Sequence, residues 1–184
     1  MLVNLLWVLL ALFCGMLPLS YWLGKLFLKV DIREYGDGNP GATNVWAAGG
    51  KWWGLTAILL DGFKGLIPVA LALYIGGVAG WWLFPLALAP SLGHIYSPFL
   101  SFKGGKALAT TFGVWTAITV YFVPLLLGAV LGIGMQFTKN EKWVILAGII
   151  CVLVGLLLWN KDLILVCAWL ANGLLLFWRY SEKS

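Results

Sequence analysis

The chain has 184 residues, of which 62% are hydrophobic and 10% are charged, and its formal net charge is +5 at pH 7. This composition excludes a soluble globular domain and indicates an integral membrane protein, because one helical span takes about 20 mainly apolar residues. The apolar stretches are continuous rather than alternating, which disfavours a transmembrane β-barrel. The basic residues are spread over loops without a basic run or a nucleic-acid-binding motif, so nucleic acid is not an expected partner.

The first apolar segment, residues 2–23, is predicted to be a span that the mature protein retains. The chain starts Met1-Leu2-Val3-Asn4, so no basic region precedes the segment, and no small-residue cleavage site follows it. A removed signal peptide would have both features.

A polar stretch, residues 36–44, follows the first span and leads into a loop that is predicted to continue to Lys51. Its glycines allow the backbone to approach a ligand closely, and its Asn and Thr side chains offer neutral donors and acceptors. It is therefore either a cradle for a phosphate group or a turn-rich linker, and its own composition favours the linker. The candidate ligand-binding residues within it are Gly38, Asn39, Gly41, Thr43 and Asn44.

The second predicted span, residues 52–75, carries two ionisable side chains, Asp61 and Lys64. A charged side chain at the bilayer centre costs ~2.5–3.5 kcal/mol on insertion scales. Their i, i+3 spacing allows the two side chains to pair on one helical face. Either they form a structural ion pair inside the bundle, or Lys64 faces the polar loops and binds an anion while Asp61 holds it in place.

The third predicted span, residues 81–100, carries the single histidine of the chain, His94. Position 99, five residues beyond it, is Phe, so the His-x4-Asp signature of acyl-CoA-type glycerolipid acyltransferases is absent. A single His at the end of a span is more often a hydrogen-bonded structural residue than a general base.

A second polar loop, residues 101–106, places Lys103 and Lys106 on either side of Gly104 and Gly105, just ahead of a predicted helix. Helix N-termini and consecutive free N–H groups attract phosphate. The loop is not a P-loop, because Ala107 follows Lys106 where Ser or Thr is required. The lysines alone suggest an electrostatic anchor, and the adjacent glycines favour an anion site.

Residues 108–137 are too long for one straight span and contain Pro124, which predicts a hairpin of two helices, with one kinked helix as the alternative. Two more spans are predicted at residues 143–159 and 163–178. With seven spans, ten of the twelve basic residues lie on one side. By the positive-inside rule that side is cytoplasmic, with the N-terminus outside and the C-terminus inside. The ten residues are Lys25, Lys29, Arg33, Lys51, Lys103, Lys106, Lys139, Lys142, Arg179 and Lys183.

The predicted fold is therefore an all-α polytopic integral membrane protein of about seven transmembrane helices, forming one domain over residues 1–184. Three cysteines, Cys14, Cys151 and Cys167, lie singly in apolar runs. They lack metal-ligand spacing and are predicted to be small hydrophobic side chains rather than metal ligands or disulfides. Neither a metal nor a cofactor is expected.

Three motifs resemble those of the bacterial membrane acyl-phosphate:glycerol-3-phosphate acyltransferase family. The first is Gly-Asn-Pro-Gly-Ala-Thr-Asn at 38–44, and the second is Asp-Gly-Phe-Lys-Gly at 61–65. The third runs from Gly-His at 93–94 through Pro-Phe-Leu at 98–100 to Phe-Lys-Gly-Gly-Lys-Ala-Leu-Ala-Thr at 102–110. The motifs keep the order and spacing of the family, and the resemblance extends to about residue 139.

This resemblance implies an enzyme of phospholipid synthesis in the bacterial cell inner membrane, with its active face in the cytoplasm. An acyl group would pass from acyl phosphate to the 1-hydroxyl of sn-glycerol 3-phosphate, giving lysophosphatidic acid and phosphate, without acyl-CoA or an acyl-enzyme. Acyl phosphate already has a good leaving group, so positioning and charge neutralisation can supply most of the catalysis. Besides the two substrates and membrane lipid, the soluble enzyme that makes acyl phosphate is an expected partner.

We expect Lys103, Lys106 and the amides of Gly104 and Gly105 to hold one phosphate group, and the 38–44 loop with Lys64 to hold the other. The candidate catalytic residues are Asn39, Thr43, Asn44, His94 and Lys106. The candidate phosphate-binding residues are Gly38, Gly41, Lys64, Lys103, Gly104 and Gly105.

The chain departs from the family pattern at several positions. Asp37 stands where the family usually has Ser, and Ala47 where it has Arg, a bidentate phosphate ligand that Ala cannot replace. Ala107 replaces a glycine, and Tyr180 and Lys183 correspond to a C-terminal His and Asn. A non-catalytic relative that binds a lipid-phosphate or glycerol-phosphate head group is therefore an alternative. A small anion transporter is a third reading, disfavoured because no internal repeat is evident.

Overall fold

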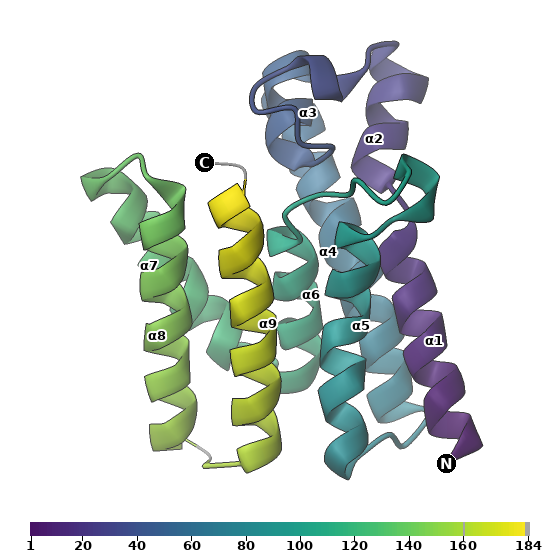
Figure 1. Ribbon diagram of the computed structural model, residues 1–184, viewed down its shortest axis with the longest axis vertical. Coiled ribbons are helices and arrows are strands. Elements are labelled where there is room, and N and C mark those ends of the chain that lie inside the picture. The colour runs from purple at the N-terminus through teal and green to yellow at the C-terminus, as the bar shows by residue number, and fades with distance from the viewer. Residues whose placement is uncertain (160, 183–184) are drawn as a thin grey trace.

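The computed structural model describes residues 1–159 and 161–182, which form a bundle of helices roughly aligned along one axis (Figure 1). The α-helices in chain order are α1 (Leu2–Met16), α2 (Leu19–Leu23), α3 (Ala42–Gly49), α4 (Lys51–Tyr74), α5 (Leu83–Ile95), α6 (Leu108–Thr119), α7 (Phe122–Phe137), α8 (Glu141–Trp159) and α9 (Leu163–Glu182). Shorter helical turns are η1 (Gly24–Leu28), η2 (Ile32–Glu34), η3 (Gly80–Trp82) and η4 (Pro98–Leu100). The described residues form no strand, which confirms the all-α prediction for that part of the chain.

Four helical stretches are long and apolar enough to cross a membrane: Leu2–Leu28, Lys51–Tyr74, Glu141–Trp159 and Leu163–Glu182. The helices α6 and α7 are apolar but shorter, and α5 has 13 residues. The count of seven spans and the orientation of the termini therefore stay predictions.

The stretch at residues 108–137 is two helices, as predicted, because α6 ends at Thr119 and α7 begins at Phe122. The reversal occurs at Val120, whose φ of 56° is incompatible with a continuing helix. Pro124 lies in the first turn of α7, where its missing N–H would have no helical partner in any case. The proline therefore accompanies the start of the second helix rather than a kink.

The first span, Leu2–Leu28, covers the predicted residues 2–23, but it is not one continuous helix. Pro18 separates α1 from α2, and the chain then continues as a π-helical turn, η1. The break releases backbone carbonyls that a regular helix would use. Leu17 O accepts from Lys64 Nζ at 2.8 Å, and Met16 O accepts from Ser97 Oγ at 2.5 Å.

The loop predicted to run to Lys51 is also shorter than expected, because Gly41 is followed by the helix α3. The second half of the polar stretch is therefore helical, and Thr43 and Asn44 lie in the first turn of α3.

Close packing between α4 and α6 fixes the centre of the bundle. A Cβ atom added to Gly113 would overlap the Gly62 carbonyl oxygen, and one added to Gly65 would overlap the Thr110 carbonyl oxygen. Small residues at such contacts allow two helix backbones to approach closely in a membrane protein. This contact holds the part of α4 that carries Asp61 against the start of α6.

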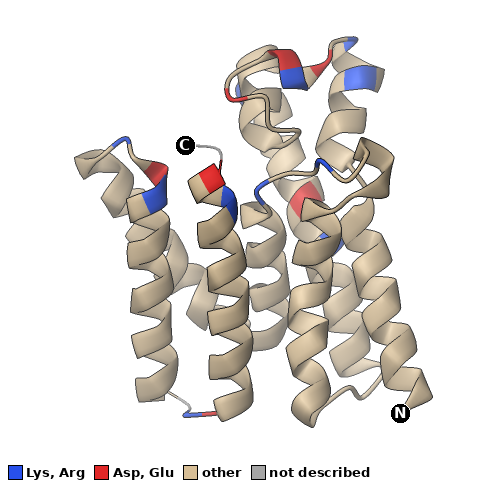
Figure 2. Cartoon of the chain, in the orientation of Figure 1, with Lys and Arg blue, Asp and Glu red and all other residues tan. Residues whose placement is uncertain are grey.

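Charged side chains gather at the end of the bundle that holds the loops before α3 and before α6 (Figure 2). The C-terminal end of α9 lies at the same end, and the N-terminus lies at the opposite end (Figure 1). The start of α9, directly after the charged residues Lys161 and Asp162, lies at the opposite end (Figure 1), while Lys64 and Asp61 are buried within the bundle. Lys183 lies outside the described residues. The grouping of the other nine basic residues agrees with the predicted charge asymmetry.

Candidate functional site

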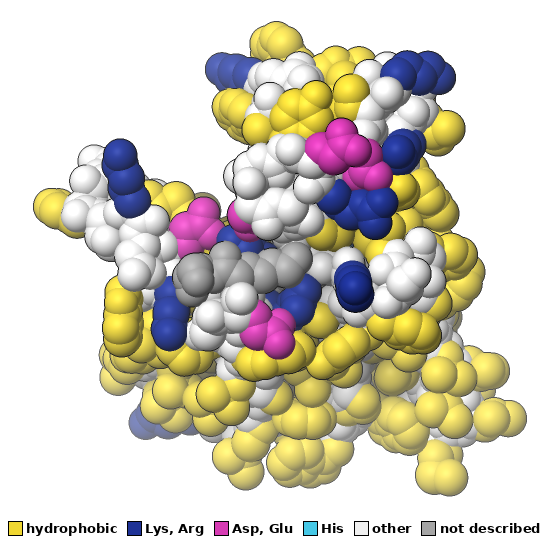
Figure 3. Space-filling view, turned by 45° about the horizontal axis from the view of Figure 1, so that its top comes forward, with side chains coloured by type: hydrophobic (Ala, Val, Ile, Leu, Met, Phe, Trp, Pro, Cys, Tyr) yellow, Lys and Arg dark blue, Asp and Glu magenta, His cyan; other side chains and the backbone are white. Residues whose placement is uncertain are grey.

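A cavity of about 800 Å³ opens at the loop end of the bundle, between the loop before α3, the start of α6 and the turn between α7 and α8. Its apolar wall includes Ile58 of α4, Phe112 of α6 and Met135 of α7. Polar side chains from both motif loops and from α3, α4 and α5 line it as well: Asn39, Thr43, Asn44, Asp61, His94 and Lys106. On the outer surface of this end of the molecule, acidic and basic side chains lie among polar ones, with hydrophobic side chains below them (Figure 3).

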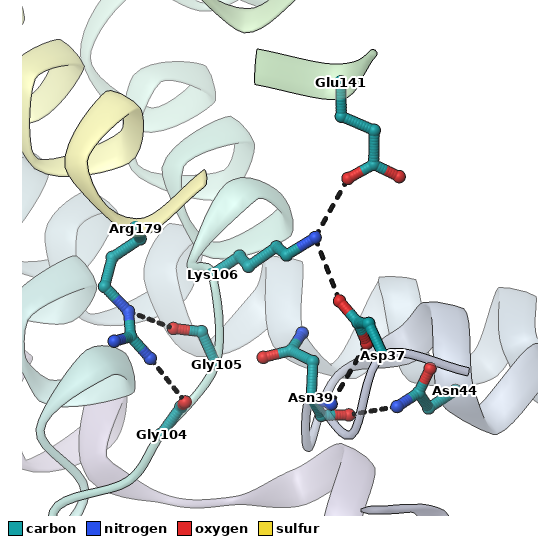
Figure 4. A network of polar contacts seen from close by, with 8 residues as sticks. All are labelled: Asp37, Asn39, Asn44, Gly104, Gly105, Lys106, Glu141 and Arg179. Atoms are coloured by element: carbon teal, nitrogen blue, oxygen red, sulfur yellow. Dashed lines mark hydrogen bonds and ion pairs between the residues drawn. The ribbon is translucent and has the colours of Figure 1, made fainter. Parts of the chain in front are cut away.

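The loop before α3 is held by its own asparagines. Asn44 Nδ2 donates to the Asn39 carbonyl oxygen at 2.8 Å, and the Asn39 N–H donates to Asp37 Oδ1 at 3.0 Å (Figure 4). A Cβ atom added to Gly36 would overlap Asn44 Oδ1, and the φ of 55° is a backbone conformation that favours glycine. Both the space and the backbone therefore disfavour a side chain at this position. The buried Asn44 therefore shapes the loop, and it lines the cavity together with Asn39, Thr43 and Gly41.

Lys106 projects into the cavity between two carboxylates. Its Nζ lies 3.0 Å from Asp37 Oδ2 and 2.9 Å from Glu141 Oε2 (Figure 4). The Tyr180 ring lies beside the ammonium group, with 4.6 Å between Nζ and the ring centroid. Burial alone would lower the pKa of Lys106, but Glu141 and Asp37 outweigh that effect and raise its pKa above the ordinary value. The ammonium group therefore stays charged at neutral pH.

The amides of Gly104 and Gly105 are not presented to the cavity, which corrects the expectation that they hold a phosphate. The Gly104 N–H donates to Ile95 O at 2.9 Å, and the Gly105 N–H donates to His94 O at 3.2 Å. A Cβ atom on either glycine would overlap the end of α5. These glycines instead allow the loop to pack on α5 and so place Lys106.

Arg179 is a functional candidate that the sequence reasoning missed. From the last turns of α9 its Nη2 donates to Gly104 O at 2.9 Å and its Nε donates to Gly105 O at 3.4 Å (Figure 4). Its sequence signal was only that of a basic residue after an apolar run, which is typical of an electrostatic anchor. The contacts show that it supports the loop that carries Lys106.

His94 is buried at the end of α5 and borders the cavity. Its Nδ1 lies 3.3 Å from Thr110 Oγ1 and 3.9 Å from Asp61 Oδ1. These contacts fit the structural role that the sequence favoured, and the cavity position also keeps the residue within reach of a bound ligand.

Asp61 and Lys64 form the predicted ion pair, with 2.7 Å between Asp61 Oδ1 and Lys64 Nζ. Ser20 Oγ donates to Asp61 Oδ2 at 2.5 Å, and Lys64 also donates to the carbonyl released at Leu17. Asp61 borders the cavity, whereas Lys64 points toward the break between α1 and α2. The alternative in which Lys64 binds a phosphate is corrected, because a buried ammonium group needs the partners that it has here.

Two further candidates lie outside the cavity lining. Gly38 and Lys103 are both exposed, and neither borders the cavity. Gly38 has a φ of 71° and serves the turn before α3. Within residues 1–159 and 161–182, no group of three or more His, Cys, Asp and Glu side chains is placed to hold a metal ion.

The departures from the family pattern that fall on described residues all line this one cavity. They are Asp37, Ala47, Ala107 and Tyr180. Lys183 lies outside the described residues. The cavity is thus the place where this chain differs from the pattern that it resembles.

A family model described as "Glycerol-3-phosphate acyltransferase" matches residues 5–184 of the chain. A Glycerol-3-phosphate acyltransferase of Staphylococcus saprophyticus is 36% identical over 173 residues, which cover 90% of this chain and 85% of that protein. The protein of the same name from Endomicrobium trichonymphae is 36% identical over 156 residues, covering 85% of this chain and 75% of the relative. Glycerol-3-phosphate acyltransferase 1 of Thermotoga maritima is 45% identical over 100 residues, which are 53% of this chain and about half of that relative, 49%.

The chain is also similar to two crystal structures of PlsY (YgiH), described as an integral membrane glycerol 3-phosphate acyltransferase. The glycerol 3-phosphate form gives a TM-score of 0.88 at 32% identity, covering 97% of this chain and 88% of that one. The lysophosphatidic acid form gives a TM-score of 0.86 with the same identity and coverage. The match in fold and the apolar helices identify this chain as a multi-pass membrane protein.

Proposed function

The chain belongs to the glycerol-3-phosphate acyltransferase family, and we propose that it transfers an acyl group from acyl phosphate to the 1-hydroxyl of sn-glycerol 3-phosphate. In this reaction the hydroxyl oxygen bonds to the acyl carbon, the bond from that carbon to the phosphate oxygen breaks, and the hydroxyl proton leaves with the phosphate. The products are lysophosphatidic acid and phosphate.

The observation that carries the proposal is the convergence of both motif loops on one cavity that has a polar end and an apolar wall. A substrate with a phosphate head and an acyl tail needs both surfaces. Lys106, Asn39 and Thr43 supply charge and hydrogen-bonding groups at the polar end, while Ile58 and Phe112 supply apolar area beside them. Positioning two substrates in such a site can account for a large part of a rate enhancement.

We assign Lys106 to the phosphate groups, since its ammonium group is the charge that the third motif brings into the cavity. Asn39, Thr43 and Asn44 orient the glycerol phosphate, with His94 beside them. A strong protein base is not required, because acyl phosphate already carries a good leaving group.

The proposed orientation has seven crossings and places the cavity on the cytoplasmic face. The grouping of basic residues at the cavity end supports this, because such residues stay on the cytoplasmic side of a membrane. Acyl phosphate would reach the cavity from that side, so the soluble enzyme that makes it is a proposed partner.

One observation favours a second candidate, a non-catalytic relative that binds a glycerol-phosphate or lipid-phosphate head group. Two carboxylates, Asp37 and Glu141, already neutralise Lys106. In addition, Ala47 offers the cavity no charge where the family usually has Arg.

The test is lysophosphatidic acid formation by the purified protein in lipid with acyl phosphate and glycerol 3-phosphate. We expect turnover, and we expect Lys106→Ala to slow it by two orders of magnitude or more, about 3 kcal/mol, as for the loss of one transition-state donor. Lys51→Ala, which removes an exposed lysine away from the cavity, is the matched control and should keep the rate.

Bound glycerol 3-phosphate without turnover would favour the non-catalytic relative. If the protein neither binds nor acylates glycerol 3-phosphate, the proposal fails, and anion transport becomes the reading to pursue.

A further inference from the structure

Lys106 is held by carboxylates from two different parts of the chain. Asp37 lies in the loop before α3, and Glu141 is the first residue of α8. The distances of 3.0 Å and 2.9 Å to Lys106 Nζ are those of charge-assisted hydrogen bonds (Figure 4). Since a lysine has three N–H donors, two of them are committed to carboxylates before any ligand binds.

The charge of this cluster is unfavourable for an anion. One ammonium group and two carboxylates sum to a net charge of −1, even though Lys106 is the cation assigned to the phosphate. Asp61, another acid at the cavity, is already paired with Lys64. Lys139 is a further cation in the cavity lining, and its single positive charge only brings the net charge of the cluster to zero.

The geometry leaves little room around the ammonium group for a ligand to bind without displacing an acid. The Tyr180 ring lies 4.6 Å from Lys106 Nζ, and the Lys106 side chain is only 13% exposed. Asp37 and Glu141 are more accessible, at 33% and 48% exposed. Asp37 also accepts from the Asn39 N–H, so Glu141 has the greater freedom to turn outward when Lys106 finds another partner.

We propose that Asp37 and Glu141 form an acidic clamp that competes with the phosphate group of the substrate for Lys106 and thereby limits the affinity of this site for anions. Asp37 and Glu141 are then specificity-determining residues of the site. This inference rests on the proposed function only in taking the ligand of Lys106 to be a phosphate group.

The clamp has a distinct kinetic consequence. The contacts of Lys106 with the two carboxylates must break before phosphate binds. The free energy needed to break them therefore raises the free energy of the bound substrate and of the transition state by the same amount. Removing one carboxylate should therefore lower KM for glycerol 3-phosphate or acyl phosphate while kcat changes little. A residue that only supports the fold would not produce this separation.

The test is a titration with inorganic phosphate of the full chain in lipid nanodiscs, comparing the wild type with Asp37→Asn and Glu141→Gln. Asp37→Asn removes the charge but keeps a side-chain oxygen for the Asn39 N–H. Each variant should bind phosphate about tenfold more tightly, since a like charge near the ligand is lost. Glu34→Gln is the matched control: it removes an exposed carboxylate that does not border the cavity, and it should leave the affinity unchanged.

The use of two variants from different parts of the chain keeps the test decisive if one of them folds poorly. Unchanged or weaker phosphate binding in the folded variants would overturn the clamp. An equal gain in Glu34→Gln would overturn it too, because the effect would then be one of overall charge.

The proposed function fails separately, if the wild type forms no lysophosphatidic acid. Tighter phosphate binding by the two variants would still support the clamp in that case.

Discussion

At the scale of single residues, Arg179 gives a prediction that does not involve direct contact with substrate. It binds the carbonyl oxygens of Gly104 and Gly105, the two residues before Lys106. Hydrogen bonds from a charged donor contribute about 1.5–3 kcal/mol each. We expect Arg179→Ala to lower thermal stability and to reduce kcat about tenfold by misplacing Lys106.

The readouts for Arg179 are thermal unfolding and the rate of lysophosphatidic acid formation. Arg179→Lys should recover part of the rate, because it retains the charge and one donor. Glu182→Gln, which removes only the negative charge of the carboxylate 2.7 Å from Arg179 Nη1, should retain most of the rate. A full rate in Arg179→Ala would show that the loop holds its shape without this residue.

The sequence could predict which residues meet but not which atoms they use. Asn39, Thr43, His94 and Lys106 do converge on one cavity, as the motifs implied. The use of the Gly104 and Gly105 amides was predicted wrongly, because their partners are carbonyl oxygens at the end of α5. Such pairings depend on how the loop folds back over a helix, which local composition does not report.

At the scale of helices, the contact between α4 and α6 should be intolerant of added volume. We expect Gly113→Ala to lower the free energy of unfolding by about 1–3 kcal/mol, because the new methyl group overlaps the Gly62 carbonyl oxygen. Turnover should fall as well, since α4 carries Asp61 and α6 begins two residues after Lys106. Unfolding in mixed micelles measures the first effect.

Gly132→Ala is the matched control for this contact. Gly132 lies in α7 with no atom within 4 Å of an added Cβ, and alanine favours a helix over glycine. Equal stability of the two variants would mean that the close approach of α4 and α6 is not required.

The sequence predicted where the long helices lie better than it predicted where helices break or begin. The apolar runs located α4, α8 and α9, and the length of the 108–137 stretch correctly indicated two helices. The break at Pro18 was missed because the apolar run continues through it, although proline ends a regular helix. α3 was missed for the opposite reason: the Gly, Asn and Pro before it suggested a loop, but they form the turn and cap that start a helix.

At the scale of the whole molecule, the separation of charge predicts how the chain crosses the membrane. The start of α4 at Lys51 and the end of α7 before Lys139 lie at the cavity end, and the start of α9 after Lys161 lies at the other end (Figure 1). In a chain whose native Cys14, Cys151 and Cys167 are replaced by alanine, a membrane-impermeant maleimide should label Lys161→Cys in intact cells. Lys51→Cys and Lys139→Cys should react only after the membrane is opened, because basic loops remain in the cytoplasm.

Labelling of Lys51→Cys and Lys139→Cys from opposite sides would mean that α6 and α7 do not cross as a pair. The seven-span topology would then be wrong for everything after residue 119. Labelling of both from outside would invert the topology and place the cavity on the wrong face for a substrate made in the cytoplasm. The short helices α6 and α7, with 12 and 16 residues, make this the most informative part of the chain to test, since a span takes about 20. If α6 and α7 do cross the membrane, packing against α4 and α8 must compensate for their short length, and the labelling of Lys139→Cys tests this.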